Sequence, residues 1–235
     1  MDEQEIRKSA ALEDRHWWYA SRRAMLRRLV SPLAPGRALD VGCGSGGNTA
    51  VLRDLGWQVT GLEYSPAAAE LAHGRGLPIV RGDATHLPFA DECLDLVIST
   101  DMWEHVPDHH AVARETARVL RPGGRALVAV PCSMKLWSGH DVALGHERRY
   151  EKDDLAAVMD AGGLEVVEMH YWNVLLRPVA RVRRRRRVTS ESEMEDSGRL
   201  LNVVLRSILA VESRLPVDQL PGISLVALAA KPHRP

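Results

Sequence analysis

Short apolar runs alternate with amphipathic stretches along most of the chain from Arg37 onward, and this alternation is its main structural signal. The apolar runs predict strands over residues 37–42, 58–62, 77–81, 94–99, 124–131 and 164–171. The amphipathic stretches predict helices over residues 47–55, 66–73, 109–120 and 152–161. Such alternation indicates an α/β fold in which helices cover both faces of a mostly parallel sheet. Binding sites in such a sheet lie at the carboxyl ends of the strands.

Both flanks of this alternating core are predicted to be helical. Residues 2–30 read as one or two helices that break near residues 14–16, and an amphipathic stretch runs from Leu200 to Leu215. An apolar strand at residues 222–230 brings the sheet to seven strands. A chain of 235 residues is long enough for one such domain and short for two. We therefore predict a single domain with a helical N-terminal lid (1–36), a core (37–173), a helical insertion (174–220), and a final strand with its tail (221–235).

A glycine-rich turn follows the first predicted strand. Gly42, Gly44 and Gly46 let the backbone bend sharply and approach a ligand, and the next helix offers free N–H groups to a polar or anionic group. Read literally, Gly42, Gly44 and Gly47 also match the dinucleotide pattern G-x-G-x-x-G, so a nicotinamide-dependent oxidoreductase is one alternative. Asp40 stands before the turn, where its charge repels a pyrophosphate but attracts an amine. This favours an amino-acid-like ligand.

Glu63 ends the second predicted strand. Its distance from the turn is close to the ~20 residues typical of an acid that binds a ribose. The turn and this acid together indicate a nucleoside ligand.

Five ordered motifs carry a resemblance to a known family. They are Asp40–Gly46, Gly61–Ser65, Gly82–Phe89, Asp95–Asp101 and Leu120–Gly124. In these motifs the chain resembles the class I S-adenosylmethionine-dependent methyltransferases, in particular their type 11-like, small-molecule branch. The resemblance implies a Rossmann-like, doubly wound sheet with an antiparallel last strand. It also implies S-adenosyl-L-methionine as cofactor and S-adenosyl-L-homocysteine as product.

The resemblance also assigns cofactor contacts residue by residue. Asp83 is expected to accept a hydrogen bond from the adenine amino group, and Thr100 and Asp101 to lie near the sulfonium. Aromatic and arginine residues in the N-terminal helices of similar proteins often reach the methionine carboxylate, a role that Tyr19 and Arg23 fit here. The alternative is that the aromatic residues of this segment pack on the core. The full expected set is Asp40, Gly42, Cys43, Gly44, Gly46, Glu63, Tyr64, Asp83, Ala84, Thr100, Asp101, Tyr19 and Arg23.

Candidate catalytic residues are the histidines near the expected methyl group. His146, His140 and His105 are possible proton acceptors for a hydroxyl substrate, with His146 first because of its neighbours. His140 and His146 lie in a polar, aromatic segment, residues 137–150, which we predict to be a long loop facing the substrate. Glu104 and His105 resemble a recurrent pair of the family, and the alternative is that they brace the loop.

Other residues of this segment are candidates for substrate binding. The set is Trp137, Arg148, Arg149, Tyr150 and, from the N-terminal helices, Trp18. Arg148 is favoured for a substrate carboxylate or phosphate. For Arg149 we favour a structural role, pairing with Asp153 or Asp154 at the start of the next helix. The spacing of His140, Asp141 and His146 matches no metal signature, so no metal is predicted.

Charge and cysteine content bear on the partners and the cellular compartment of the protein. Lys and Arg number 31 and Asp and Glu 31, so no net field draws the chain to nucleic acid or an anionic membrane. The arginine run at residues 183–187 is followed by acidic residues 191–196 that neutralise it locally. The three scattered cysteines suggest reduced thiols and a cytoplasmic protein, and no apolar stretch predicts export or a membrane span.

We therefore predict a cytoplasmic methyltransferase of a small metabolite or natural product. Oxygen is the favoured acceptor atom, either in a hydroxyl or in a carboxylate such as a peptide C-terminus. The alternatives are N- or C-methylation, a non-catalytic nucleoside-binding protein, and an RNA methyltransferase that uses the arginine run. The oligomeric state is not predicted.

Overall fold

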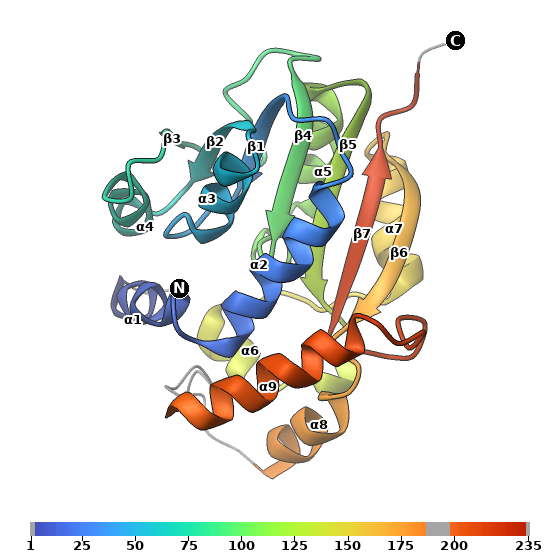
Figure 1. Ribbon diagram of the computed structural model, residues 1–235. Coiled ribbons are helices and arrows are strands. Elements are labelled where there is room, and N and C mark those ends of the chain that lie inside the picture. Colours follow the sequence, from blue (N-terminus) through green and yellow to red (C-terminus); the bar gives the residue numbers. More distant parts are fainter. Residues whose placement is uncertain (1–2, 187–197, 234–235) are drawn as a thin grey trace.

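A computed structural model describes residues 3–186 and 198–233. Its centre is a seven-stranded sheet in the order β3-β2-β1-β4-β5-β7-β6 (Figure 1). Neighbouring strands are parallel, except that β7 runs antiparallel to β5 and β6. The predicted Rossmann-like, mostly parallel sheet is thereby confirmed. The strands are β1 Arg37–Val41, β2 Gln58–Glu63, β3 Ile79–Arg81, β4 Leu94–Thr100, β5 Leu120–Pro131, β6 Glu165–Trp172 and β7 Ser224–Ala230.

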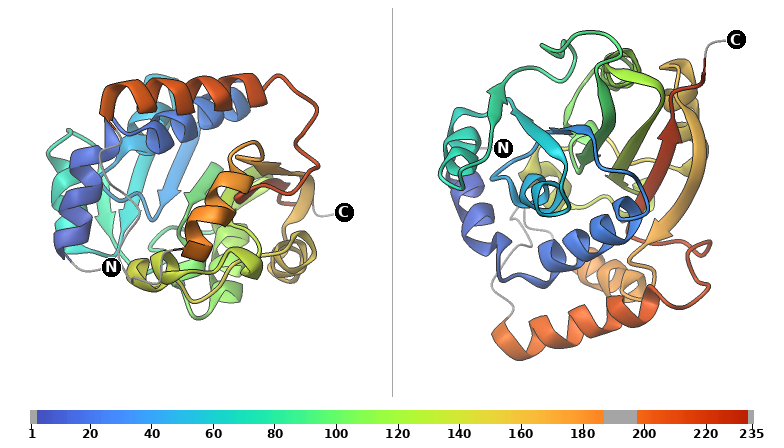
Figure 2. Two further views of the ribbon diagram at one scale, coloured as in Figure 1. Left: turned by 90° about the horizontal axis from the view of Figure 1, so that it is seen from below. Right: turned by 45° about the horizontal axis from the view of Figure 1, so that its top comes forward.

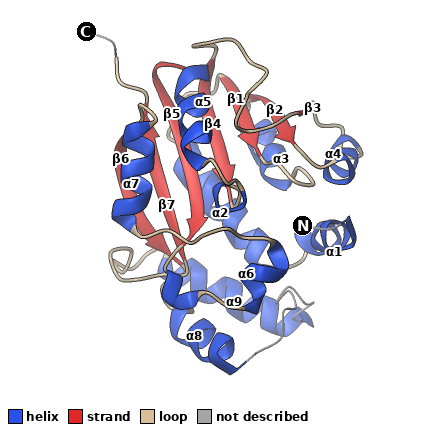
Figure 3. Cartoon of the chain, turned by 180° about the vertical axis from the view of Figure 1, so that it is seen from behind, coloured by secondary structure: helices blue, strands red, loops and turns tan. Residues whose placement is uncertain are grey.

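Helices cover both faces of the sheet. The helices are α1 Glu3–Glu13, α2 Trp17–Val30, α3 Gly47–Asp54, α4 Pro66–His73, α5 His109–Val119, α6 Gly139–Leu144, α7 Lys152–Ala161, α8 Arg177–Arg186 and α9 Gly198–Glu212, with short 3₁₀ turns η1 Trp103–His105 and η2 Met134–Leu136. Leu26 of α2 and Leu52 of α3 pack on one face of the central strands. Val112 of α5 and Leu155 of α7 pack on the other face, which is turned toward the viewer in Figure 3.

The observed elements begin and end within a few residues of the predicted ones, with one change of type. The segment 137–150, predicted as an irregular loop, contains the short helix α6. Ser138 and Asp141 form a capping box at its start, and Gly145 ends it in the left-handed conformation. The cap at Ser138 begins the helix and Gly145 ends it. A helix this short has too few turns to show a hydrophobic period in the sequence.

The N-terminal and late helices lie together beyond the carboxyl ends of the strands. Figure 2 shows α9 running alongside α2. The backbone N–H of Trp17 donates to Oδ1 of Asn202 in α9 at 2.7 Å. The rings of Trp18 and Trp172 pack with their centroids 5.0 Å apart, so both segments are tied to the end of β6. Among the described residues, no helix is both long enough and apolar enough to cross a bilayer.

Candidate functional site

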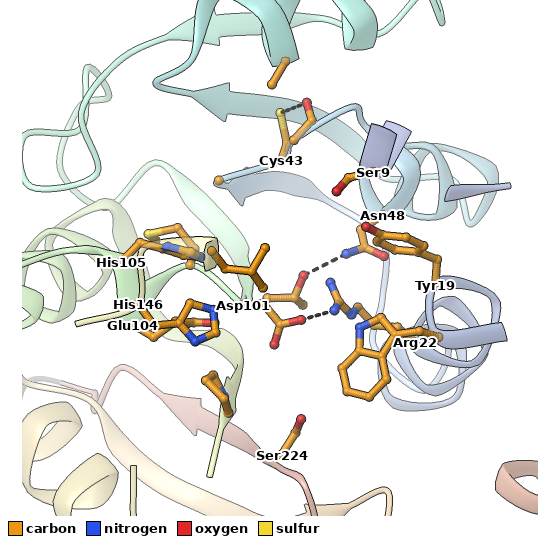
Figure 4. A pocket seen from close by; sticks show the side chains of 18 of the residues that line it. Ser9, Tyr19, Arg22, Cys43, Asn48, Asp101, Glu104, His105, His146 and Ser224 are labelled. Carbon is orange, nitrogen blue, oxygen red and sulfur yellow. Dashed lines mark hydrogen bonds and ion pairs between the residues drawn. The ribbon is translucent and has the colours of Figure 1, made fainter. Parts of the chain in front are cut away.

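A cavity of about 900 Å³ opens at the carboxyl ends of β1, β2, β4 and β5. Helices α1, α2, α6, α8 and α9 also contribute to its wall. In Figure 4, Cys43 lies at one end, Ser224 of β7 at the opposite end, and Asp101 and Arg22 between them. The cavity therefore lies at the edge of the sheet where the alternating pattern predicts binding.

The glycine turn forms part of the cavity wall. Gly42 and Gly44 have φ angles of 73° and 56°, in the left-handed region that favours glycine. A Cβ atom on Gly42 would lie 2.5 Å from Cγ of Met102, whereas one on Gly44 would meet no heavy atom within 4 Å. The backbone at Gly44 is therefore open to a ligand. Cys43 between them also lines the cavity.

Glu63 connects the turn to the end of β2. Its carboxylate accepts hydrogen bonds from the backbone N–H groups of Gly44 and Ser65, both at 2.8 Å. The side chain lines the cavity and is half-buried, so free lone pairs of the carboxylate remain available to a ligand. This is the placement expected of an acid that binds ribose hydroxyls.

Asp40 and Gly46 lie behind the glycine turn, on its side away from the cavity. Neither residue lines the cavity. Asp40 is 1% exposed and accepts a hydrogen bond from Oγ1 of Thr49 at 2.6 Å, and burial raises the pKa of its carboxyl to about 7. Gly46, with a φ of 89°, packs against Leu77 and Ala72. Direct cofactor contact by these two residues therefore stays a prediction, and in this structure both lie behind the residues that line the cavity.

Three expected adenine-side residues do line the cavity. Asp83 accepts hydrogen bonds from the backbone N–H and the hydroxyl of Thr85, both at 2.8 Å, and these bonds hold the pKa of Asp83 below its usual value. An ionised carboxylate there can accept from an amino group. Ala84 contributes apolar wall, and Tyr64 is 75% exposed at the rim.

The end of β4 meets helix α2 at the middle of the cavity. Thr100 accepts a hydrogen bond from the side-chain amide of Asn48 at 2.8 Å, and Asp101 forms an ion pair with Arg22. Arg23, the arginine expected from the sequence, lies outside the cavity wall and donates to the carbonyl oxygen of Glu13 at 2.9 Å. Arg22 occupies the position expected of Arg23.

Helical geometry explains this difference. The guanidinium of Arg22 lies 5.5 Å from the ring centroid of Trp18 and 5.7 Å from that of Tyr19. Positions 18 and 19 lie four and three residues before 22, so these three side chains share a helix face. The same spacing also groups Tyr19 with Arg23, so the packing of α2 decides that Arg22 points inward. Tyr19 and Trp18 line the cavity as expected, together with Asn48, which the sequence did not single out.

A Glu-His-His cluster, composed of Glu104, His105 and His146, lies on the cavity wall. Figure 4 shows it on the side opposite Tyr19 and Arg22. The two imidazole rings are 4.8 Å apart between centroids, and Nε2 of His146 is 4.0 Å from the Glu104 carboxylate. Burial raises the pKa of Glu104 to about 8, and burial beside His146 lowers that of His105 to about 4. The sequence-predicted His140 lines the same cavity.

Asp141 holds His146 in place from behind. Its buried carboxylate lies 2.8 Å from Nδ1 of His146 and 2.7 Å from the guanidinium of Arg149. Arg149 is thus an internal ion-pair partner that also touches the cavity wall. The expected pairing of Arg149 with Asp153 or Asp154 is not formed, because Glu151 and Asp154 cap α7 themselves.

The other three candidates from this segment do not line the cavity. Arg148 donates to the carbonyl oxygens of Val106 and Pro107 and so braces the loop after η1. Tyr150 is buried, with its hydroxyl 2.7 Å from Nδ1 of His109. Trp137 is half-buried outside the wall. Substrate contact by Arg148, Tyr150 or Trp137 is therefore not supported, because the loop turns these side chains toward the protein.

A glycine turn after β1, an acid at the end of β2 and a second acid after β3 share one cavity on a seven-stranded sheet with a reversed β7. This combination defines the class I S-adenosylmethionine-dependent methyltransferases.

Comparisons with known proteins also point to a methyltransferase. Residues 39–128 match the methyltransferase domain family. A protein of Mycolicibacterium smegmatis named "Probable S-adenosylmethionine-dependent methyltransferase" is 30% identical over 161 residues, which cover 66% of this chain and 62% of that relative. The chain thus spans less than two thirds of the length of this relative. These matches support a class I S-adenosylmethionine-dependent methyltransferase.

Solved structures share the fold. The Haloferax volcanii protein solved in complex with the Trm112 methyltransferase activator has a TM-score of 0.68 and 24% identity, over 99% of this chain and 96% of that one. Haemonchus contortus phosphoethanolamine N-methyltransferase 2, solved with S-adenosyl-L-methionine, has a TM-score of 0.69 and 19% identity, over 99% of this chain and 58% of that one.

S-adenosyl-L-methionine is the cofactor of this class, and the cavity fits it. Gly44 leaves its backbone open, Glu63 presents a half-buried carboxylate for ribose hydroxyls, and Asp83 presents an ionised acceptor for an amino group. Asp101 also lies on the wall near the middle of the cavity, where Arg22 already balances its charge. These residues would hold the nucleoside end against β1, β2 and β3.

Proposed function

We propose that the protein transfers a methyl group from S-adenosyl-L-methionine to a hydroxyl oxygen of a small molecule with an apolar body. One observation carries this proposal. The cavity that holds the nucleoside-binding residues Gly44 and Glu63 continues without a break to the Glu-His-His cluster. An acceptor bound beside the cluster would share one cavity with the cofactor.

The cluster supports a hydroxyl as the acceptor group. The bound cofactor supplies an electrophilic methyl group. Asp141 holds Nδ1 of His146, so the lone pair of the imidazole is at Nε2, on the side of Glu104 and the cavity. The cluster can therefore hydrogen-bond an acceptor hydroxyl and assist the loss of its proton. Most of the remaining acceleration comes from alignment and exclusion of water.

Arg22, Arg148 and Arg149 give little support to a carboxylate acceptor, and the further arginine of the wall, Arg183 of α8, is exposed. Arg22 pairs with Asp101, Arg149 pairs with Asp141, and Arg148 donates to backbone carbonyls. A substrate carboxylate, including a peptide C-terminus, would have to compete with these internal partners. We therefore favour a hydroxyl over a carboxylate.

The lining of the far end supports an apolar body for the acceptor. Trp18 and Leu176 line the wall there with Leu201, Leu205 and Ile223. Apolar pockets with few polar groups are typical of small-molecule sites. A metabolite or natural product with a single reactive hydroxyl fits this arrangement, and the net charge of zero is consistent with an uncharged acceptor.

The test is release of S-adenosyl-L-homocysteine from purified protein with matched phenol, alcohol, amine and carboxylic acid acceptors. Preference for a hydroxyl supports the proposal. Preference for an amine would replace it with N-methylation. Cofactor binding without product from any acceptor would instead favour a non-catalytic nucleoside-binding protein.

Replacement of His146 tests the role of the cluster. With a hydroxyl acceptor, we expect His146→Ala to lower kcat by about 10²- to 10⁴-fold, the range typical of a lost proton-transfer group. The affinity for S-adenosyl-L-methionine should stay unchanged, because His146 lies away from Gly44 and Glu63. Steady-state kinetics and calorimetry give the two quantities. The exposed His110, which does not line the cavity, provides the matched control His110→Ala. Equal kcat values for both variants would remove His146 from the mechanism.

A further inference from the structure

The Glu-His-His cluster has the composition and arrangement of a metal site. Each of its three side chains offers one ligand atom, and these atoms lie within 4.8 Å of one another. We propose that Glu104, His105 and His146 bind a divalent transition-metal ion, with one or more coordination positions open to the cavity. The three residues come from two segments, η1 and the loop after α6, that only the fold brings together.

Hydrogen bonds orient both imidazoles for coordination. Nδ1 of His105 lies 3.2 Å from the carbonyl oxygen of Gly145, which can only accept, so Nδ1 carries the hydrogen. Nδ1 of His146 lies 2.8 Å from the Asp141 carboxylate, which is charge-paired with Arg149 and also accepts. Both rings therefore have their lone pair at Nε2. A metal-binding histidine nearly always donates its other nitrogen in this way, to a carbonyl or a carboxylate.

Glu104 provides an independent observation. Its side chain is fully buried, and neither carboxylate oxygen receives a hydrogen bond from any described residue. A buried carboxylate without hydrogen bonds is costly, whereas coordination to a cation satisfies its lone pairs and its charge. Simple bracing of the loop, the other role considered for this residue, leaves both oxygens without a partner.

The ligand set selects a class of ion. Two imidazole nitrogens and one carboxylate oxygen, with an open position, are typical of catalytic zinc sites and also suit other first-row ions. Ligand atoms around zinc at about 2.0 Å are roughly 3.3 Å apart. The 4.0 Å between His146 and Glu104 must therefore shorten when an ion binds. Magnesium and calcium, which prefer oxygen ligands, fit less well.

The role of the ion rests on the proposed function. An open position facing the cavity would accept the oxygen of the acceptor and lower the pKa of its hydroxyl. A bound ion also occupies the lone pair of His146, so the ion would assist proton loss in place of the free imidazole.

Titration of tag-free, chelator-treated protein with Co²⁺ tests the site directly. We expect visible absorption bands that saturate at one ion per chain and that disappear when Zn²⁺ is added. The variants Glu104→Gln, His105→Ala and His146→Ala should each weaken binding by about 100-fold or more, since loss of an outer-shell partner alone costs 10- to 100-fold. The control His140→Ala removes a histidine of the same cavity outside the cluster and should bind Co²⁺ like the unaltered protein.

Thermal unfolding with and without Zn²⁺ provides a second readout. Zn²⁺ should raise the Tm of the unaltered protein and of His140→Ala, because an ion that binds only the folded state stabilises that state. The Tm of the three cluster variants should not change when Zn²⁺ is added. No saturable Co²⁺ binding by the unaltered protein, or binding by all three cluster variants that is as tight as binding by the unaltered protein, would overturn the proposal.

These measurements need no acceptor, so they separate the site from the reaction. Saturable Co²⁺ binding without methyl transfer to any acceptor would support the metal site and reject the proposed function. Methyl transfer by chelator-treated protein that binds no Co²⁺ would support the proposed function and reject the metal site.

Discussion

At the scale of single residues, the cavity depends on which of two adjacent arginines points inward. Arg22 pairs with Asp101 and contacts two aromatic rings, whereas the neighbouring Arg23 donates to the carbonyl oxygen of Glu13. The side chains of Arg22 and Asp101 are 10% and 25% exposed, so their charges are largely removed from water. Removing one partner of such a pair leaves the other charge uncompensated.

This contrast predicts unequal effects of two matched substitutions. Arg22→Ala should lower the free energy of unfolding by about 3 kcal/mol, the cost of breaking a buried ion pair. Arg23→Ala should lower it by about 1 kcal/mol, the value of one ordinary hydrogen bond. Urea unfolding of both variants measures the difference. If Arg23→Ala proves the more damaging, the orientation of α2 described above is incorrect.

At the scale of elements, α1 is held to the glycine turn by one carboxylate. Glu13, its last residue, accepts from the hydroxyl of Ser45 at 2.6 Å and the backbone N–H of Gly47 at 3.2 Å, and forms an ion pair with Arg75 at 2.8 Å. Ile6, Ser9 and Ala10 of the same helix line the cavity. The attachment of α1 and the closure of the cavity therefore depend on the same residue.

Loss of this carboxylate should release α1. Hydrogen bonds to a charged group contribute about 2 kcal/mol, so Glu13→Ala should speed amide hydrogen exchange in α1 roughly 30-fold. The affinity for S-adenosyl-L-methionine should fall with it, as calorimetry can show. The neighbouring Asp14 is exposed and has Arg75 as its ion-pair partner, so Asp14→Ala is the control and should have little effect. Equal exchange in both variants would show that α1 is held by other contacts.

At the scale of the whole molecule, the buried Asp40 links stability to pH. Its carboxyl has a raised pKa of about 7 in the folded protein, mainly because of burial, against about 3.9 in an unfolded chain. The folded state therefore binds the proton more tightly. This contribution destabilises the protein progressively as the pH rises from about 4 to 7 and is constant above that range.

Asp40→Asn should remove that dependence. The unaltered protein should lose more stability between pH 5 and pH 8 than the variant, by about 3 kcal/mol, because about two pKa units of the shift fall inside this window. Denaturant unfolding at both pH values measures this difference. Asp54→Asn changes an exposed carboxylate and should keep the slope of the unaltered protein. Identical slopes for the Asp40 variant and the unaltered protein would show that Asp40 is ionised throughout.

Local signals account for the parts that the sequence predicted well. Ser65 and Pro66 begin α4, and Gly42 and Gly44 form the turn in the left-handed conformation that only glycine adopts readily. Glu63 is predicted from its place at the end of the second strand, ~20 residues after the turn, and the parallel pairing of β1 with β2 brings it beside that turn. In each case the deciding interaction is within one element or between neighbouring strands.

Only the tertiary structure decided which side chains of the helices and long connections face the cavity. A helix turns by about 100° per residue, so the choice between Arg22 and Arg23 depends on how α2 packs against the sheet. The Glu-His-His cluster joins residues 41 positions apart, from His105 to His146, through a segment that folds into α6. The sequence by itself determined the sheet, the glycine turn and a nucleoside ligand, because these follow from local conformation and strand order, whereas the particular cofactor followed from the resemblance of five motifs to a known family. The acceptor side of the cavity depends on packing between distant segments, for which the sequence has no local signal.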